Sequence, residues 1–220
     1  MTTETELNDL KAAARAAAAD ELDVGALSAA VSRRAAAEGI LDLVYAEVDS
    51  PLGRLLAVST PEGLVHLGYP NRALDSQLEL LARRISPRIV ESPRDLDPVR
   101  RQLGEYFEGA RRDFDLDLDW QLTAGFVRAV LERTAAIPFG ETRTYGEVAA
   151  AAGSPRAFRA AGRALGANPI PIVVPCHRVL RSGGALGGYG GGLNVKRELL
   201  QLEGVLEPEL SRERSAGRGR

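Results

Sequence analysis

Three short runs rich in apolar residues begin near residue 43, in the stretch "LVYAEVDSPLGRLLAVSTPEGLVHLGYP". The runs are separated by "SPLG" and "TPEG", each of which places a proline and then a glycine in turn positions. Tight turns of this kind join antiparallel neighbours. The pattern therefore predicts an antiparallel meander of three strands.

Helical periodicity follows the meander. Apolar residues recur at three- and four-residue spacing in "NRALDSQLELLARRI" and in "DPVRRQLGEYFEG", so both segments are predicted to be amphipathic helices. In "RRDFDLDLDW" every second residue from Phe114 to Trp120 is apolar and the residues between them are acidic, which indicates an extended segment at a sheet edge. Together these elements predict a small α+β domain over residues 43–120.

A second, mainly helical domain is predicted over residues 121–205. Within it, "TYGEVAAAAGSPRAFRAAGRALGAN" contains a short helix, a break at Gly153-Ser154-Pro155, and a second helix from Arg156 to about Ala167. Ser154 is expected to be the N-cap and Pro155 the first helical residue. This spacing is typical of a helix-turn-helix.

The second of these helices carries a stripe of arginines. At about 100° per residue, Arg156, Arg159 and Arg163 fall within an arc of about 60°. Alanines occupy most of the remaining positions, and a slim helix of this kind can approach a duplex closely. The alternative is an ordinary surface helix whose arginines lie in solvent.

The two ends of the chain differ from its middle. Residues 1–42 are alanine-rich and predict a helical extension of unknown role, whereas residues 206–220 are charged, lack apolar periodicity and predict a disordered tail. The start has no basic leader followed by an apolar core, and no run approaches the roughly 18 apolar residues that span a membrane. The sequence therefore predicts a cytoplasmic protein that does not contact a membrane.

Charge is distributed unevenly, although the net charge is only -2. Residues 141–197 carry eight Arg or Lys and two acidic residues, a balance of +6, so the rest of the chain carries -8. A basic face on an acidic body is the arrangement that neutralises phosphates locally. A solvated basic face with no partner is the alternative.

The chain has one cysteine, Cys176, and it lies in "PIPIVVPCHRVLRSGGALGGYGGG". One cysteine and two histidines fall short of a four-ligand structural zinc site, so no metal is expected. Most lone cysteines are small buried apolar residues. The dense glycines after Cys176 argue against that interpretation in this chain, because such segments are usually found where the backbone approaches a ligand.

A catalytic thiol needs a base, and His177 follows Cys176 directly. Neighbours in sequence point in different directions, so a direct bond between them is not expected and a bridging water is the simpler geometry. A histidine acting as a base also needs an acid to fix its tautomer, and Glu203 is one candidate.

These residues resemble a known family. "PCHRV", with "NPIPIVV" before it and "GGYGGGLNVKRELLQLEG" after it, is similar to the active-site signature of the O6-alkylguanine-DNA alkyltransferases, and "DSPLG", "IPFGETRTYGEVA" and "RAAGRALGANP" extend the resemblance from about Val44 to Gly204. The resemblance implies an RNase H-like first domain. It also implies that a flipped O6-alkylguanine in duplex DNA gives its alkyl group irreversibly to the cysteine, without a cofactor. O4-alkylthymine is a further candidate substrate.

The resemblance assigns a role to individual residues. Cys176 is the nucleophile, His177 the base acting through water, Glu203 the acid that orients His177, and Asn168 the hinge between the recognition helix and the active-site loop. Arg159 enters the base stack in place of the extruded base. The recognition helix lies in the minor groove, and the protein binds DNA as a monomer. The remaining implied contacts are with substrate, at Tyr145, Val179, Tyr189 and Gly190. Further residues expected to contact DNA are Arg156, Arg163, Arg178 and Ser182.

Some positions depart from the family pattern, since Gly190 stands where some relatives have Ser or Ala and Glu198 where many have Trp. Two other functions are alternatives. Alkyltransferase-like proteins recognise the lesion without removing it, but they lack the cysteine that this chain has. A cysteine hydrolase is the third class, but adjacent Cys and His after a helix-turn-helix do not suit one.

Overall fold

The computed structural model describes residues 42–207. The extension predicted over residues 1–42 and the tail predicted over residues 206–220 therefore lie almost entirely outside the described residues. None of the helices in this part of the chain combines the length and the apolar character that crossing a membrane requires.

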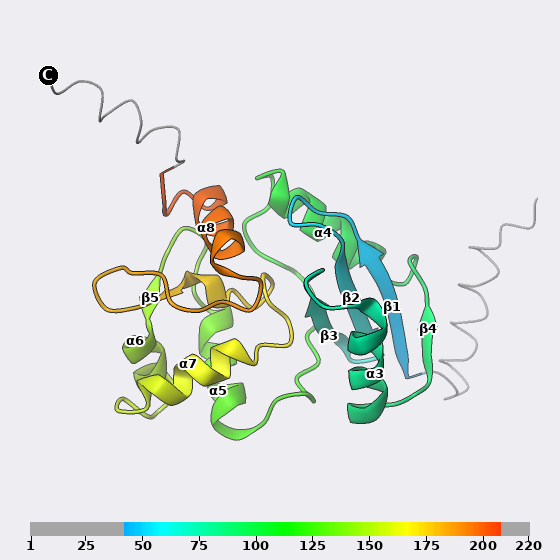
Figure 1. Cartoon of the computed structure of the whole chain (residues 1–220), viewed down its shortest axis with the longest axis horizontal. Coiled ribbons are helices and arrows are strands. Elements are labelled where there is room, and N and C mark those ends of the chain that lie inside the picture. The colour runs from blue at the N-terminus through cyan, green and yellow to red at the C-terminus, as the bar shows by residue number, and fades with distance from the viewer. Residues whose placement is uncertain (1–41, 208–220) are drawn as a thin grey trace, which may run out of the picture.

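Four strands form the sheet of the first domain, in the spatial order β3, β2, β1, β4 (Figure 1). β1 (Leu43–Val48), β2 (Leu55–Thr60) and β3 (Gly63–Gly68) pair antiparallel, which confirms the predicted meander. The sequence pattern did not reveal β4 (Ile89–Glu91), which pairs parallel with β1. A strand of three residues is too short to show a period of two.

Two helices follow the meander, α3 (Leu74–Arg84) and α4 (Asp97–Phe107). They cover opposite faces of the sheet, because successive residues of β2 point to opposite sides. Leu56 joins the buried cluster that contains Leu81 of α3, whereas Leu55 joins the cluster that contains Leu103 of α4. The central strand is therefore buried on both faces.

The extended segment predicted at a sheet edge lies against β3. The Leu64 amide donates to the Asp117 carbonyl at 2.8 Å, and the Asp119 amide donates to the Leu64 carbonyl at 2.9 Å. This segment thus covers the edge of β3 and leads the chain into the second domain.

The second domain is mainly helical. Its elements are α5 (Gly125–Ala135), β5 (Arg143–Thr144), α6 (Tyr145–Ala151), α7 (Phe158–Gly166), the 3-10 turn η1 (Cys176–Arg178), β6 (Val179–Leu180) and α8 (Leu193–Leu202). α6 begins with a capping box, in which the Thr144 hydroxyl accepts from the Glu147 amide and the Glu147 carboxylate accepts from the Thr144 amide. α6 and α7 are the two helices predicted for the helix-turn-helix.

The predicted start of the second helix was wrong. α7 begins at Phe158 rather than at Arg156, and its N-cap is Ala157 rather than Ser154. Ser154 lies instead in the preceding turn, where its carbonyl accepts from the Ala157 amide at 2.9 Å. The proline at 155 suits this turn as well as it suits a helix start, so its presence alone did not decide between them.

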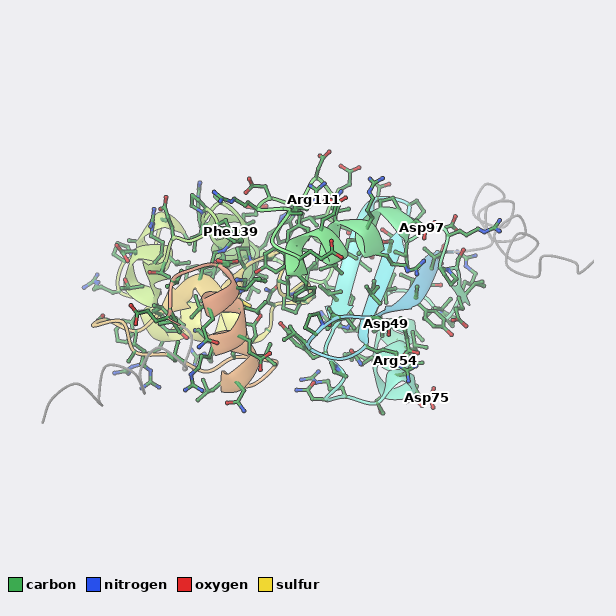
Figure 2. All side chains as sticks on the ribbon, turned by 90° about the horizontal axis from the view of Figure 1, so that it is seen from above. Asp49, Arg54, Asp75, Asp97, Arg111 and Phe139 are labelled. Carbon is green, nitrogen blue, oxygen red and sulfur yellow. The ribbon has the colours of Figure 1, made fainter. Side chains whose placement is uncertain are left out.

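The two domains lie side by side (Figure 1), and one continuous apolar cluster includes residues of both. The Leu67 amide at the end of β3 donates to the Pro169 carbonyl at 2.8 Å. Phe139 of the second domain meets Tyr106 of α4 edge to face, with ring centroids 6.2 Å apart. Figure 2 shows Phe139 and Arg111 on the two sides of this junction.

Candidate active site

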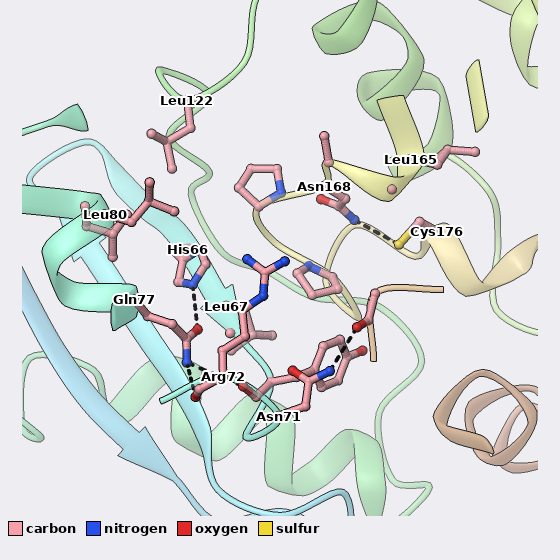
Figure 3. A pocket seen from close by; sticks show the side chains of 18 of the residues that line it. His66, Leu67, Asn71, Arg72, Gln77, Leu80, Leu122, Leu165, Asn168 and Cys176 are labelled. Atoms are coloured by element: carbon pink, nitrogen blue, oxygen red, sulfur yellow. Dashed lines mark hydrogen bonds between the residues drawn. The ribbon is translucent and has the colours of Figure 1, made fainter. Parts of the chain in front are cut away.

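Cys176 is held at the start of η1, in the second domain, where it is 7% exposed. Asn168 fixes it in place, because its Nδ2 donates both to the Val174 carbonyl at 2.8 Å and to Cys176 Sγ at 3.1 Å (Figure 3). Asn168 follows directly after the end of α7, so it links the predicted recognition helix to the thiol.

The segment between Asn168 and Cys176 is strained. Ile172 is the one described residue other than glycine with a positive φ, at 73°, and it is fully buried. A β-branched side chain rarely adopts this conformation, and strain of this kind is concentrated at functional sites. Ile172 lies midway between Asn168 and Cys176, whose side chains meet in the hydrogen bond described above.

His177 and Glu203 form a buried pair behind the thiol. His177 Nε2 lies 2.9 Å from Glu203 Oε1, and both side chains are inaccessible to solvent. Burial raises the pKa of Glu203, but the hydrogen bonds from His177 and Arg178 outweigh it and lower that pKa to about 2. An ionised carboxylate only accepts hydrogen bonds, so Nε2 carries the imidazole proton.

The opposite ring nitrogen of His177 is therefore the basic one. His177 Nδ1 is buried and has no hydrogen-bond partner among the described residues. Burial lowers the pKa of His177, which keeps the ring neutral near neutral pH. No direct hydrogen bond joins Nδ1 to Cys176, as expected for neighbours in sequence.

The prediction that Arg178 contacts DNA was wrong. Arg178 is only 4% exposed, and its guanidinium donates to both carboxylate oxygens of Glu203, at 2.8–3.2 Å, and to the Ile137 carbonyl. Tyr106 of the first domain donates to the same carboxylate at 2.7 Å. The Glu203 carboxylate thus accepts hydrogen bonds from the His177 imidazole, the buried Arg178 guanidinium and a tyrosine of the first domain.

Two residues near the thiol were not predicted from the sequence. Lys196 of α8 is fully buried and donates to the Val179 carbonyl at 2.6 Å, and burial lowers its pKa to about 8. Tyr69, at the end of β3, places its hydroxyl 2.6 Å from that of Tyr189. Both contacts join distant parts of the sequence, and no local pattern marks them.

The surroundings of Cys176 have opposing effects on the thiol. Burial raises its pKa and is the dominant influence, whereas the hydrogen bonds from Asn168 and Tyr189 and the charge of Lys196 favour the thiolate. The thiol therefore stays protonated at rest and is surrounded by groups that stabilise the anion.

A cavity of about 880 Å³, which we call the outer cavity, opens beside α7. It brings together five of the predicted site residues with an aromatic side chain that the sequence did not single out, Phe158. Its walls are Tyr145, Gly146, Phe158, Arg159, Gly162, Gly166, Arg181, Ser182 and residues 187–190. Phe158 is half exposed, and the Arg159 guanidinium lies 5.5 Å from its ring centroid.

The other predicted site residues lie outside the outer cavity. Arg156 and Arg163 are exposed, Arg163 on α7 and Arg156 in the turn before it. Val179 is fully buried, and its carbonyl accepts the hydrogen bond from Lys196. Among residues 42–207 no group of three or more His, Cys, Asp or Glu is placed to hold a metal ion.

Two family models match the chain. Residues 43–120 match the ribonuclease-like domain of 6-O-methylguanine DNA methyltransferase, and residues 125–205 match its DNA binding domain.

Individual proteins are similar over the same region. A methylated-DNA–protein-cysteine methyltransferase of Mycolicibacterium paratuberculosis is 44% identical over 72% of this chain and 91% of its own length. One of Methanosarcina barkeri is 40% identical over 73% of this chain and 97% of its own length. The crystal structure of Mycobacterium tuberculosis OGT in complex with DNA superposes with a TM-score of 0.63 at 40% identity and covers 73% of this chain and 92% of that one. The chain therefore belongs to the 6-O-methylguanine DNA methyltransferase family, as its active-site motif predicts.

Proposed function

We propose that this protein repairs duplex DNA by moving the alkyl group of O6-alkylguanine onto its own Cys176 in one irreversible step. The observation that carries the proposal is the position of the thiol. Cys176 Sγ lies 3.1 Å from Asn168 Nδ2, and the next residue in sequence is His177, whose Nε2 is hydrogen-bonded to Glu203. Family membership supports the same activity. No cofactor is required, because the protein supplies the nucleophile and the base.

The transfer begins with removal of the thiol proton. His177 Nδ1, the free acceptor of the ring, takes this proton through a bridging water. Glu203 stabilises the imidazolium that results, because its carboxylate accepts from Nε2 at 2.9 Å. Asn168, Tyr189 and Lys196 then stabilise the thiolate.

The thiolate attacks the carbon that is bound to O6. A sulfur–carbon bond forms, the carbon–O6 bond breaks, and its electron pair remains on the base, which takes up one proton and leaves as guanine. The product is a thioether, which has no leaving group as good as the guanine anion, so the protein acts once.

The outer cavity suits an extruded nucleobase. Base-modifying proteins take the target base out of the duplex and hold it in a pocket with polar and aromatic walls. Tyr145 and Tyr189 supply the aromatic walls, and the small Gly190 leaves room on the side from which the thiol is reached. α7 lies in the minor groove, with Arg159 in the stack and Arg156, Arg163 and Ser182 near the phosphates. The protein acts as a monomer in the cytoplasm.

Arg159→Ala is expected to slow alkyl transfer from duplex DNA about tenfold or more, because unstacking a base costs a few kcal/mol and Arg159 offsets that cost by filling the gap. Reaction with the free base O6-benzylguanine needs no unstacking and should keep its rate. Single-turnover rates on both substrates test this. Arg163→Ala, on the same helix but outside the outer cavity, is the matched control. It should weaken binding to the duplex without lowering the rate of alkyl transfer from duplex that is already bound. Equal losses on both substrates would show that Arg159 is structural.

The transfer rate with free O6-benzylguanine is expected to rise from about pH 6 to about pH 8. Burial raises the pKa of Cys176, so the thiolate fraction grows as pH increases, while the lowered pKa of His177 keeps the base neutral. Above its pKa of about 8, Lys196 loses the charge that favours the thiolate, so the rise should flatten. A rate that falls over this range would show instead that His177 must be protonated.

The function itself is tested on the DNA. A duplex with one O6-methylguanine is incubated with the full chain, digested to nucleosides and assayed for O6-methylguanine and guanine. We expect one guanine to appear for each O6-methylguanine lost. Removal of the whole base, or an unchanged lesion, would contradict the proposal.

A further inference from the structure

Tyr69 of the first domain lies against the glycine loop of the second domain. It follows β3 directly and is buried. Its hydroxyl lies 2.6 Å from the Tyr189 hydroxyl, and the two rings meet edge to face with centroids 5.9 Å apart. The backbone of Gly191 approaches the Tyr69 ring so closely that a Cβ there would lie 3.0 Å from it. The proposed reaction uses Tyr189 to stabilise the thiolate and leaves Tyr69 without a role.

Tyr189 belongs to a segment that gives it little support of its own. The other five residues of 187–192 are glycines, whose backbone has more conformational freedom than that of any other residue. The loop after β3 supplies the support instead, because Asn71 Nδ2 donates to the Gly190 carbonyl at 3.2 Å (Figure 3) and Tyr69 bonds to the Tyr189 hydroxyl. The position of the Tyr189 side chain therefore depends on the first domain.

The hydrogen bonds around Tyr189 run in one direction. Tyr189 is hydrogen-bonded to Cys176, and this bond favours the thiolate. A thiolate has no proton to donate, so the Tyr189 hydroxyl is the donor, and its single proton is committed to sulfur. The proton in the 2.6 Å bond between the two hydroxyls then comes from Tyr69. Burial raises the pKa of both tyrosines, so both hydroxyls keep their protons while the thiol ionises.

We infer that Tyr69 is a positioning residue for alkyl transfer: by donating to Tyr189 it holds the Tyr189 hydroxyl toward Cys176 Sγ and strengthens the bond that stabilises the thiolate. The inference rests on the proposed function, in which this thiolate is the nucleophile. A hydroxyl that accepts a hydrogen bond becomes a better donor, so two hydroxyls in a chain stabilise an anion more than one does. The first domain thereby supports a nucleophile that belongs to the second.

The Tyr69 hydroxyl reaches the thiol through one residue. Among the described residues it has a single hydrogen-bond partner, which is Tyr189. The other polar or titratable side chains around the thiol are Asn168, Tyr145, His177 and Lys196. Removal of the Tyr69 hydroxyl leaves their hydrogen bonds unchanged, so its effect on the thiol passes through Tyr189.

The test compares two single variants with their double variant. Tyr69→Phe and Tyr189→Phe each remove one hydroxyl and keep the ring, and the double variant removes both. Tyr45→Phe is the matched control, because Tyr45 of β1 packs in the separate apolar cluster that contains Leu81 and takes no part in the site.

Two rates are measured with the full chain and with each variant. The first is single-turnover transfer from free O6-benzylguanine. The second is the alkylation of the protein by iodoacetamide as a function of pH. Because Cys176 is the only cysteine of the chain, this second rate reports the ionisation of its thiol and requires no repair activity.

We expect Tyr69→Phe to slow benzyl transfer about threefold or more near neutral pH, and to move the iodoacetamide profile to higher pH because the thiolate loses support. Tyr189→Phe should have both effects at least as strongly. The double variant should be no slower than Tyr189→Phe alone, because Tyr69 acts through that hydroxyl. Tyr45→Phe should match the parent in both rates.

Additive losses in the double variant would overturn the inference, because they would show that Tyr69 acts independently of Tyr189. An iodoacetamide profile of Tyr69→Phe identical to that of the parent would overturn it as well, since a contact that only supports packing leaves the ionisation of the thiol unchanged. A parent that transfers no benzyl group, although its iodoacetamide profile still responds to Tyr69→Phe, would contradict the proposed function instead.

Discussion

Cys176→Ala is expected to abolish alkyl transfer and to retain binding to a duplex that contains O6-methylguanine. The variant loses the sulfur that forms the new bond, whereas the outer cavity and the exposed arginines near α7 are unchanged. Binding is measured by fluorescence anisotropy of a labelled duplex, and transfer by the intact mass of the protein. Because this is the only cysteine of the chain, the variant has no thiol left to accept the group.

The parent incubated with the same duplex without the lesion is the control for this experiment. A gain of one alkyl group by the variant would show that another side chain is the acceptor. The melting curve of the variant is recorded as well, because it distinguishes loss of binding by a folded protein from loss of binding by unfolding. Alanine replaces a small buried side chain, and we expect a loss of roughly 1 kcal/mol in the free energy of unfolding.

Glu203→Gln is expected to destabilise the fold strongly. The carboxylate is inaccessible to solvent and accepts hydrogen bonds from His177, Arg178 and Tyr106. Removing its charge leaves the buried guanidinium of Arg178 without an anion, which typically costs about 3–5 kcal/mol in the free energy of unfolding. For a chain of this size the melting temperature should fall by roughly 6–20 °C.

Glu198→Gln, on α8 about one turn before Glu203, is the matched control for this change. Glu198 is exposed, and its substitution should change the free energy of unfolding by less than about 0.5 kcal/mol. Thermal melting of both variants gives the comparison, and a Glu203→Gln midpoint close to that of the control would contradict the described network. The Glu203→Gln variant should also transfer more slowly at a temperature where it is folded, because the imidazolium loses its counter-charge.

The pKa of Glu203 gives the same network a pH dependence. Its folded-state pKa of about 2 lies below the ordinary value of 4.5, so the stabilisation is present above about pH 4.5 and is lost as pH falls toward 2. Acid unfolding of the parent should therefore begin in this window.

The periodic elements could be predicted from the sequence, because apolar spacing reports directly which face of a strand or helix is buried. The meander and the helices α3 and α4 were found in this way, whereas the two helices of the helix-turn-helix were found from the break at Gly153-Ser154-Pro155. β4 was missed because it has only three residues, and the start of α7 was misplaced because Ser-Pro fits a turn as well as an N-cap.

The site was predictable only in part. The thiol, the imidazole and the glycine loop are adjacent in sequence and could be recognised there. Glu203 was only one candidate acid for His177 until the resemblance assigned it that role. Arg178 was assigned to DNA because an arginine after the motif is basic, and nothing local shows that it pairs with a carboxylate 25 residues away. Tyr69 lies 120 residues from Tyr189, and only the packing of the two domains brings them together.

The central claim is that Cys176 accepts one alkyl group once, and mass spectrometry tests it most directly. The full chain is incubated with a tenfold excess of duplex containing O6-methylguanine. The masses of the intact protein and of its proteolytic peptides are then measured. The account predicts one added methyl group per protein molecule, located on the peptide that contains Cys176, and one repaired base per protein even after long incubation. More than one repaired base per protein molecule, or a methyl group on any other residue, would contradict it.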